Sequence, residues 1–222
     1  MVLILSIETA TAACSVALHD QGNLVAHTTL VQRYTHVESL MVIIKELLEI
    51  SKYNRKDLAA IAVSSGPGSY TGLRIGAAVG KGLCYGLGIP LIAVPTLVAM
   101  AAGIAPCIVD KAVLLCPALD ARRHAIYTLI ADRSGQIKRD AHVALVDSSA
   151  YLASLPQQPL LFLGDGALKC KPYLVKRSDI HYAEAVMPSA AHIGPLAFVR
   201  FQQQCWEDIA HYAPCYLSQF QS

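Results

Sequence analysis

The chain begins with short apolar segments separated by turn-forming residues, a pattern that is typical of β-strands. Residues 3–9 form an apolar run, and residues 14–19 alternate larger apolar side chains with small or polar ones, so each segment predicts a strand. The sequence Gln21-Gly22-Asn23 predicts a tight turn into a further strand over residues 24–31. The start of the chain is therefore expected to be an antiparallel meander.

Helices and strands alternate in the next part of the chain. Apolar periodicity and length predict strands over residues 59–65 and 90–94, and helices over residues 36–51, 70–87 and 96–102. Thr35 and Glu38 have the spacing of a capping box at the start of the first helix, while Gly88 and Pro90 end the second. A strand meander followed by this alternation matches one half of the actin-like ATPase fold, so we predict an α/β protein of that class.

The second half of the chain repeats this pattern with shorter elements. After a linker-like stretch over residues 103–110, strands are predicted over residues 113–119, 124–131, 142–146 and 160–163, and helices over residues 148–154 and from Ser189 to about Trp206. We interpret this half as a smaller, eroded copy of the first, because its strands follow the same order. The expected organisation is an amino-terminal subdomain, residues 1–102, and a smaller carboxy-terminal subdomain, residues 103–222.

The composition favours a globular protein of the cytosol. The 222 residues are 54% hydrophobic and 15% charged, which is sufficient for a substantial core. No apolar run reaches the length of about 18 residues that a membrane-spanning helix requires. The first apolar run is not preceded by the Lys or Arg of a secretory signal, so we expect a cytoplasmic protein without a membrane span.

Cysteine content and net charge argue against two classes of function, metal binding at a common zinc motif and nucleic-acid binding by this chain alone. The seven cysteines are an odd number and lie mostly in apolar surroundings, which suits a reducing compartment. The sequence contains neither the paired cysteines of a zinc ribbon nor the histidine pair of a helical zinc motif, so no metal site is predicted. A net charge of +2 argues against a chain that binds nucleic acid alone through a strongly basic surface.

The helix predicted over residues 36–51 is apolar over about half of its circumference, which is wider than the stripe of about 100° that one core contact needs. Such a helix can face two neighbours, its own sheet and the matching helix of a second chain. Burial of the whole helix within one domain is the alternative. The residues that we assign to a partner interface on this helix are Val37, Leu40, Met41, Ile44 and Leu48.

The helix predicted over residues 70–87 carries glycines four residues apart at Gly72, Gly76 and Gly80, with Gly82 and Gly86 nearby. Each glycine inside a helix costs about 1 kcal/mol relative to alanine, so close packing is expected to compensate. Small residues at this spacing let a second backbone approach. We assign Gly72, Leu73, Gly76 and Gly80 to the partner interface, with packing against the protein's own sheet as the alternative.

The turn between the predicted strand and this helix is the main candidate for chemistry. Residues 65–72, Ser-Gly-Pro-Gly-Ser-Tyr-Thr-Gly, join a strand to a helix start, where backbone N–H groups can hold a phosphate. The spacing is not that of a Walker loop, and Pro67 lacks one of the donors. A purely structural turn is favoured, and proximity of Gly66 and Gly68 to a nucleotide is the alternative.

Other polar segments offer little support for catalysis. Glu8 follows the first strand at the place where actin-like ATPases bind phosphate and metal, and we interpret it as a turn or surface residue, with proximity to a nucleotide as the alternative. Residues 120–124, Asp-Ala-Arg-Arg-His, predict a solvated loop. Residues 161–166 predict a strand that ends in a glycine turn, which is either an ordinary turn or near an adenine. No nucleophile and base are paired by local context, so no catalytic residue is assigned.

Three segments together resemble the bacterial TsaB (YeaZ) family. They are Ile-Glu-Thr-Ala at residues 7–10, Ser-Ser-Gly-Pro-Gly-Ser-Tyr-Thr-Gly-Leu-Arg at residues 64–74, and Asp-Ala-Arg-Arg at residues 120–123 followed by Tyr127. The second segment is the most specific. The resemblance extends from the first strand to about residue 130. Members of that family are similar to TsaD, the enzyme that transfers threonylcarbamoyl to the adenosine at position 37 of tRNAs reading codons that begin with A, but they look inactive.

The resemblance implies a non-catalytic subunit that supports TsaD. It implies a heterodimer with TsaD through the two amino-terminal helices, an ATPase subunit, TsaE, that joins the complex, and a homodimer through the same faces. It also implies that tRNA is contacted mainly through the complex. We expect no intrinsic cofactor, with ATP or ADP at the interface of the complex.

Two hypotheses from other classes stay open at this point. A small ATPase or phosphotransferase of the actin-like fold is suggested by the glycine turns at residues 66–72 and 164–166. Turnover of nucleotide by the purified protein would support it. A metal-dependent peptidase is the third hypothesis, and it requires a bound metal that elemental analysis would detect.

Overall fold

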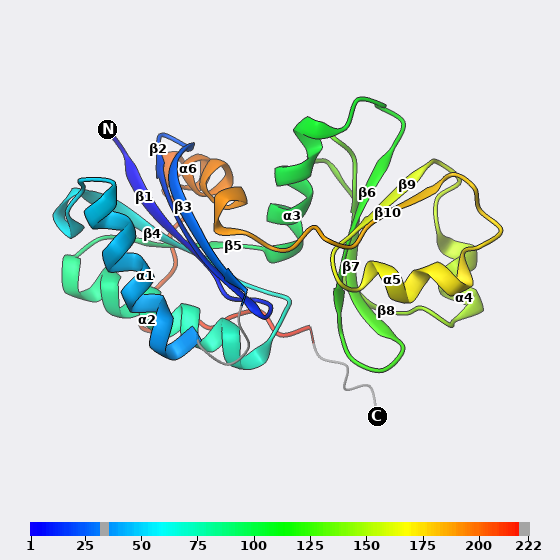
Figure 1. Cartoon of the computed structure of the whole chain (residues 1–222), viewed down its shortest axis with the longest axis horizontal. Coiled ribbons are helices and arrows are strands. Elements are labelled where there is room, and N and C mark those ends of the chain that lie inside the picture. The colour runs from blue at the N-terminus through cyan, green and yellow to red at the C-terminus, as the bar shows by residue number, and fades with distance from the viewer. Residues whose placement is uncertain (32–35, 218–222) are drawn as a thin grey trace. The chain divides into compact units, whose positions relative to one another are not determined.

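The computed structural model describes residues 1–31 and 36–217, except for the side chains of residues 36–38, and the chain forms two units (Figure 1). The first unit contains residues Met1–Ala99 and Pro188–Cys215. Its sheet has the order β3-β2-β1-β4-β5. The strands are β1 (Leu3–Glu8), β2 (Ala13–Asp20), β3 (Asn23–Val31), β4 (Leu58–Ser64) and β5 (Leu91–Val94). The first three pair antiparallel, whereas β4 and β5 are parallel to β1, so the predicted meander is confirmed.

The turn between β2 and β3 has the backbone that its sequence predicts. Gln21 and Gly22 have φ angles of +50° and +83°, and these two residues separate the strands. Positive φ at both central positions is typical of a type I′ turn, whose twist matches that of a hairpin. The expected capping residue Thr35, in contrast, lies outside the described residues.

Helices cover both faces of the first sheet. On one face, α1 (His36–Ile50) and α2 (Tyr70–Leu87) lie side by side, and α6 (Gly194–Gln202) lies on the other (Figure 1). Side chains alternate along β1, so Leu3, Leu5 and Ile7 enter the core with α1, whereas Ile4 packs with Ala197 of α6. Helix α3 (Thr96–Ile104) contributes Ala99 to the core between this sheet and α6. The sheet is therefore buried on both faces.

The second unit repeats this topology with shorter helices. Its sheet has the order β10-β9-β6-β7-β8, built from β6 (Leu114–Asp120), β7 (Ala125–Ala131), β8 (Ile137–Leu145), β9 (Leu160–Leu163) and β10 (Ile180–Ala183). The first three strands pair antiparallel and the last two are parallel to β6. Helix α4 (Ser149–Ser154) has 6 residues where α1 has 15, and α5 (Ala167–Cys170) has 4 where α2 has 18. The prediction of an eroded second copy is confirmed.

The structure divides the chain after Ala99, whereas the prediction placed the boundary after residue 102 and assigned residues 103–222 to one subdomain. Residues Pro188–Cys215 belong to the first unit. Ile193 and Ala197 are fully buried in its core, and the amide of Ala190 donates to Ser15 Oγ of β2 at 2.9 Å. Apolar residues in a late helix do not indicate which sheet they cover, so the sequence pattern could not reveal this return.

Candidate functional site

Glu8 is the last residue of β1, and its side chain is completely buried. The interpretation of Glu8 as a turn or surface residue is therefore wrong. Its Oε1 accepts a hydrogen bond from the amide of Ala10 at 2.6 Å, while Oε2 lacks a partner among the described residues. Burial raises the pKa of Glu8 to about 7, outweighing the lowering by hydrogen bonds to Ala10, Ser64 and Thr9. The carboxyl group is thus held partly protonated near neutral pH.

The turn from Ser65 to Ser69 uses its backbone groups within the chain. The amide of Gly66 donates to Thr96 Oγ1 at 3.2 Å, and the amide of Ser69 donates to the carbonyl oxygen of Ala10 at 2.6 Å. Two of the donors that would hold a phosphate are therefore already paired. This supports the structural interpretation of the turn, while proximity of Glu8, Gly66 and Gly68 to a nucleotide stays a prediction.

Glycine at residues 66 and 68 is explained by close backbone contacts. Gly66 has a φ of +100°, and a Cβ atom there would lie 2.5 Å from the carbonyl oxygen of Cys215. A Cβ atom at Gly68 would lie 2.5 Å from the carbonyl oxygen of Ala10. Because neither backbone can move aside cheaply, Gly66 allows the segment at Cys215 to approach the turn, and Gly68 allows the loop after β1 to approach the start of α2.

The glycine ridge of α2 faces the protein's own sheet. A Cβ atom at Gly72 would overlap the carbonyl oxygen of Thr9, and one at Gly76 would overlap Thr9 Oγ1. At Gly80, it would lie 2.7 Å from Val63 Cγ1 of β4. Leu73, on the same side of the helix, is also buried. The assignment of Gly72, Leu73, Gly76 and Gly80 to a partner interface is therefore wrong, because these residues are buried within the first unit, with Thr9 after β1 and Val63 of β4 beside the glycines.

A second row of small residues on α2 points away from the sheet. Ala78, Gly82 and Gly86 are exposed, and a Cβ atom at Gly82 or Gly86 would meet no described atom within 4 Å. Tyr85, beside them, is 86% exposed. The sequence contains this row as clearly as the buried one, since it has the same four-residue spacing, but spacing alone does not tell which row is covered.

Helix α1 exposes fewer of the assigned apolar side chains than predicted. Leu40, Ile44 and Leu48 are buried against the first sheet, so their assignment to a partner interface is wrong. Met41 is 39% exposed, and its assignment to a partner interface stays a prediction. The side chain of Val37 lies outside the described residues. Val42 and Ile50, which the prediction did not assign, are exposed as well.

The charged turn between β6 and β7 is a solvated loop, as predicted. Arg122, Arg123 and His124 are exposed, and the two arginines have φ angles of +69° and +46°. Asp120 Oδ1 accepts hydrogen bonds from the amide of Arg122 and from Lys169 Nζ, both at 2.5 Å. These bonds hold the loop in a conformation that non-glycine residues adopt rarely.

The turn after β9 is an ordinary close-packed turn. Gly164 has a φ of +98°, and a Cβ atom there would lie 2.6 Å from the carbonyl oxygen of Ala118. A Cβ atom at Gly166 would lie 2.9 Å from the same oxygen. The adenine alternative for this segment therefore has no support, because backbone packing accounts for both glycines.

Among the described residues, no group of three or more His, Cys, Asp and Glu side chains is arranged to hold a metal ion. None of the helices in residues 1–31 and 36–217 is long and apolar enough to cross a membrane.

Comparisons with known proteins identify the family. Residues 23–211 match the family model of TsaD, tRNA N6-adenosine threonylcarbamoyltransferase. The tRNA threonylcarbamoyladenosine biosynthesis protein TsaB of Escherichia coli is 31% identical over 220 residues, which cover 96% of this chain and 94% of that protein. The chain belongs to the TsaB (YeaZ) family. TsaB of Bacillus subtilis is also 31% identical, over 96% of this chain and 93% of its own length.

Solved structures agree with the TsaB fold. YeaZ from Pseudomonas aeruginosa superposes with a TM-score of 0.82 at 24% identity, over 98% of this chain and all of that one. Component A of (R)-2-hydroxyglutaryl-CoA dehydratase from Acidaminococcus fermentans superposes with a TM-score of 0.53 at 9% identity, over 92% of this chain and 100% of that one. These likenesses and the two sheets confirm the predicted actin-like ATPase fold.

Proposed function

We propose that this protein is a non-catalytic subunit for the formation of N6-threonylcarbamoyladenosine at position 37 of tRNA, and that it pairs with the TsaD transferase in the cytoplasm. The observation that carries the proposal is the 31% identity to TsaB proteins over nearly the whole chain. The paired backbone donors of the turn at Gly66 and Ser69 agree with a supporting role rather than with an independent ATPase. The ATPase alternative is therefore not favoured.

The surface that we propose for TsaD is the outward side of α1 and α2. It consists of Met41, Val42 and Ile50 from α1 and Ala78, Gly82, Tyr85 and Gly86 from α2, all of them exposed. Each of the two glycines costs about 1 kcal/mol relative to alanine inside a helix, and nothing in the described part of the chain packs on them. Close approach of a partner helix would compensate this cost, because small residues four apart form a shallow groove.

We propose further interactions of this chain and of its complex with TsaD. A second copy of this chain competes for the outward side of α1 and α2, which would give a homodimer when TsaD is absent. We further propose that TsaE joins the complex, that tRNA is contacted mainly through it, and that ATP or ADP binds at its interface near Glu8, Gly66 and Gly68 rather than as an intrinsic cofactor. Equilibrium binding of nucleotide to this chain with and without TsaD tests the last point.

The substitution Gly82→Leu tests the proposed surface. The leucine side chain enters open space, so the monomer should stay folded, whereas a helix of TsaD would be held away. We expect the affinity for TsaD, measured by titration calorimetry, to fall at least about tenfold, and tRNA modification in a reconstituted assay to fall with it. The matched control is Val199→Leu on α6, which enlarges an exposed side chain outside that surface and should leave both measurements unchanged.

The two proposals, the binding surface for TsaD and the function, can be contradicted independently. If the Gly82→Leu protein binds TsaD with unchanged affinity, the assigned surface is wrong, although the function is untouched. If the wild-type protein neither binds TsaD nor increases modification by TsaD, the proposed function itself is wrong.

A further inference from the structure

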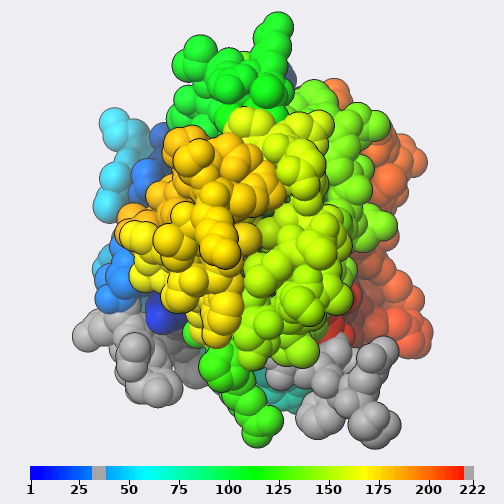
Figure 2. All heavy atoms as spheres, turned by 90° about the vertical axis from the view of Figure 1, so that its right-hand side faces the viewer, coloured from blue at the N-terminus to red at the C-terminus, as the bar shows by residue number. Residues whose placement is uncertain are grey.

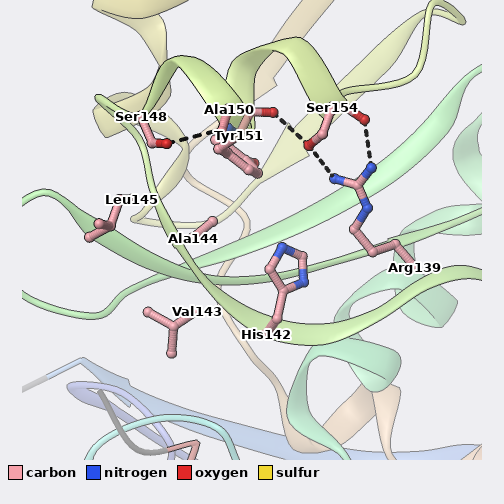
Figure 3. Close-up of a pocket in the computed structure, with 9 residues that line it drawn as sticks. All are labelled: Arg139, His142, Val143, Ala144, Leu145, Ser148, Ala150, Tyr151 and Ser154. Carbon is pink, nitrogen blue, oxygen red and sulfur yellow. Dashed lines mark hydrogen bonds between the residues drawn. The ribbon is translucent and has the colours of Figure 1, made fainter. Parts of the chain in front are cut away.

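A hollow of about 440 Å³ lies between β8 and α4 of the second unit (Figure 3). In Figure 2 the second unit faces the viewer, and the yellow-green residues around α4 lie at its surface. The volume is within the range of small-molecule sites, about 300–1,000 Å³. Polar groups converge on the hollow from the strand and the helix, namely those of Arg139, His142, Ser148, Tyr151 and Ser154.

An irregularity in β8 brings two of these side chains to the hollow. Thr128 of β7 lies opposite His142, and Ile130 lies opposite Arg139, so three steps along β8 correspond to two along β7. Side chains three residues apart on a regular strand point to opposite faces of the sheet. The bulge cancels this alternation and directs Arg139 and His142 to the same side (Figure 3).

Arg139 is a half-buried cation without an acidic partner. Its guanidinium donates from Nη1 to Ser154 Oγ at 3.2 Å and from Nη2 to the carbonyl oxygen of Ser154 at 2.6 Å, and both acceptors are neutral. Within the described residues, no carboxylate lies within 4.0 Å of it. A guanidinium has five N–H donors, so an anion can bind beside these two contacts. Serine thus holds the cation in place and leaves its charge uncompensated.

The rest of the hollow is suited to a flat, apolar group. The rings of His142 and Tyr151 are 6.4 Å apart between centroids and tilted by 60°. His142 Nδ1 lies 2.8 Å from the carbonyl oxygen of Asp140. Because a carbonyl can only accept, this nitrogen donates, and the ring position is fixed. The side chains of Ala144 and Ala150 add apolar surface to the walls, and Val143 and Leu145 border the hollow along β8.

We propose that the hollow between β8 and α4 binds a small molecule in which a phosphate or carboxylate group is joined to a flat, largely apolar ring. Arg139 pairs with the anionic group, since a guanidinium matches two oxygens of either anion. The rings of His142 and Tyr151 contact the flat part. The site lies entirely in the second unit and does not depend on the pairing of the first unit with TsaD.

Four probes test the proposal on the full-length protein by titration followed with amide NMR spectra. Phenyl phosphate and benzoate carry both an anion and a ring, benzyl alcohol carries only the ring, and inorganic phosphate only the anion. We expect phenyl phosphate or benzoate to shift signals of β8 and α4, with an affinity at least about tenfold higher than either incomplete probe. Whichever of the two binds more tightly identifies the natural anion as phosphate or carboxylate.

Two variants test whether the probe binds in the hollow. Arg139→Gln should lower the affinity for the tighter-binding probe at least about tenfold. The control Lys138→Gln, at the preceding residue of the strand, should leave this affinity unchanged. Because Arg139 also holds Ser154 and its replacement can disturb the fold, Ala150→Phe is a second variant that fills the hollow from the exposed side of α4. The proposal is overturned if neither complete probe binds saturably, if an incomplete probe binds as well, or if Ala150→Phe leaves the affinity unchanged.

Discussion

Glu8 makes the free energy of unfolding of this protein depend on pH. Its carboxyl group is surrounded by protein at the end of β1, and its pKa is raised from 4.5 to about 7. Between these values the folded state keeps a proton that the unfolded state has lost. The free energy of unfolding contributed by Glu8 is therefore highest below pH 4.5 and decreases as the pH rises to 7.

We expect Glu8→Gln to remove this dependence, because a neutral amide needs no proton. The difference between the pKa values, about 2.5, corresponds to about 3 kcal/mol. Relative to wild type, the variant should gain up to about that amount of stability between pH 5 and pH 8, measured by urea unfolding at several pH values. Buried His19 and half-buried His192 have pKa values that are lowered by loss of solvent, so both destabilise the fold below pH 6.5. They do so equally in wild type and variant, so their effect cancels in the comparison. A constant difference across this range would contradict the assigned burial of a carboxylic acid.

No pattern in the sequence could predict this environment. Glu8 ends an apolar strand, and the same position in a hairpin is often exposed. Its burial depends on the loop that follows, which Gly68 and Gly72 allow to approach α2. Those glycines are distant in sequence, so the contact is a product of the tertiary fold.

Helix α2 carries two rows of small residues that have opposite roles. Gly72, Gly76 and Gly80 lie against the sheet, whereas Gly82 and Gly86 face outward. Periodicity predicted the helix and its small residues correctly. It could not assign the rows, because a helix with apolar and small residues on several sides gives no clear polar face.

Alanine substitutions should distinguish the two rows. Gly72→Ala forces a Cβ atom into the carbonyl oxygen of Thr9 and is expected to lower the free energy of unfolding by about 1–3 kcal/mol. Gly82→Ala meets no atom and should raise it by about 0.5–1 kcal/mol through helix propensity. Urea unfolding of the monomer measures both. Equal effects at the two positions would show that the row assigned to the sheet is not packed there.

Element lengths explain which parts of the fold could be predicted. The longer helices and strands of the first unit were recognised because they contain several periods of the apolar pattern. Strand β10 and helix α5 have 4 residues each and were not predicted, since they lack the continuous apolar run that indicates the equally short β9. The bulge in β8, which directs Arg139, also leaves no signature in the apolar pattern.

At the scale of the whole molecule, α6 is the element that completes the first unit from a distant part of the chain. Ala197 is completely buried, whereas Val199, two residues later on the same helix, is 49% exposed. The helix therefore has one side in the core and one in solvent. The sequence alone could not show that its buried side packs on the first sheet.

We expect Ala197→Glu to destabilise the first unit by several kcal/mol, because an unpaired charge would enter an apolar core. Val199→Glu, the same substitution on the exposed side, should change stability by less than about 0.5 kcal/mol. Thermal unfolding and amide exchange of β1 and β4 measure the effect. If both variants unfold at the same temperature as wild type, α6 is not part of that core.

The return of residues Pro188–Cys215 to the first unit has a consequence for synthesis on the ribosome. The residues between Met100 and Met187, which contain all of the second sheet, leave the ribosome before α6 does. The unit whose strands are made first can therefore cover Ile4 and Ile92 only when the last helix has emerged. Until then a nascent chain exposes one apolar face of its sheet, which makes it a substrate for chaperones during translation.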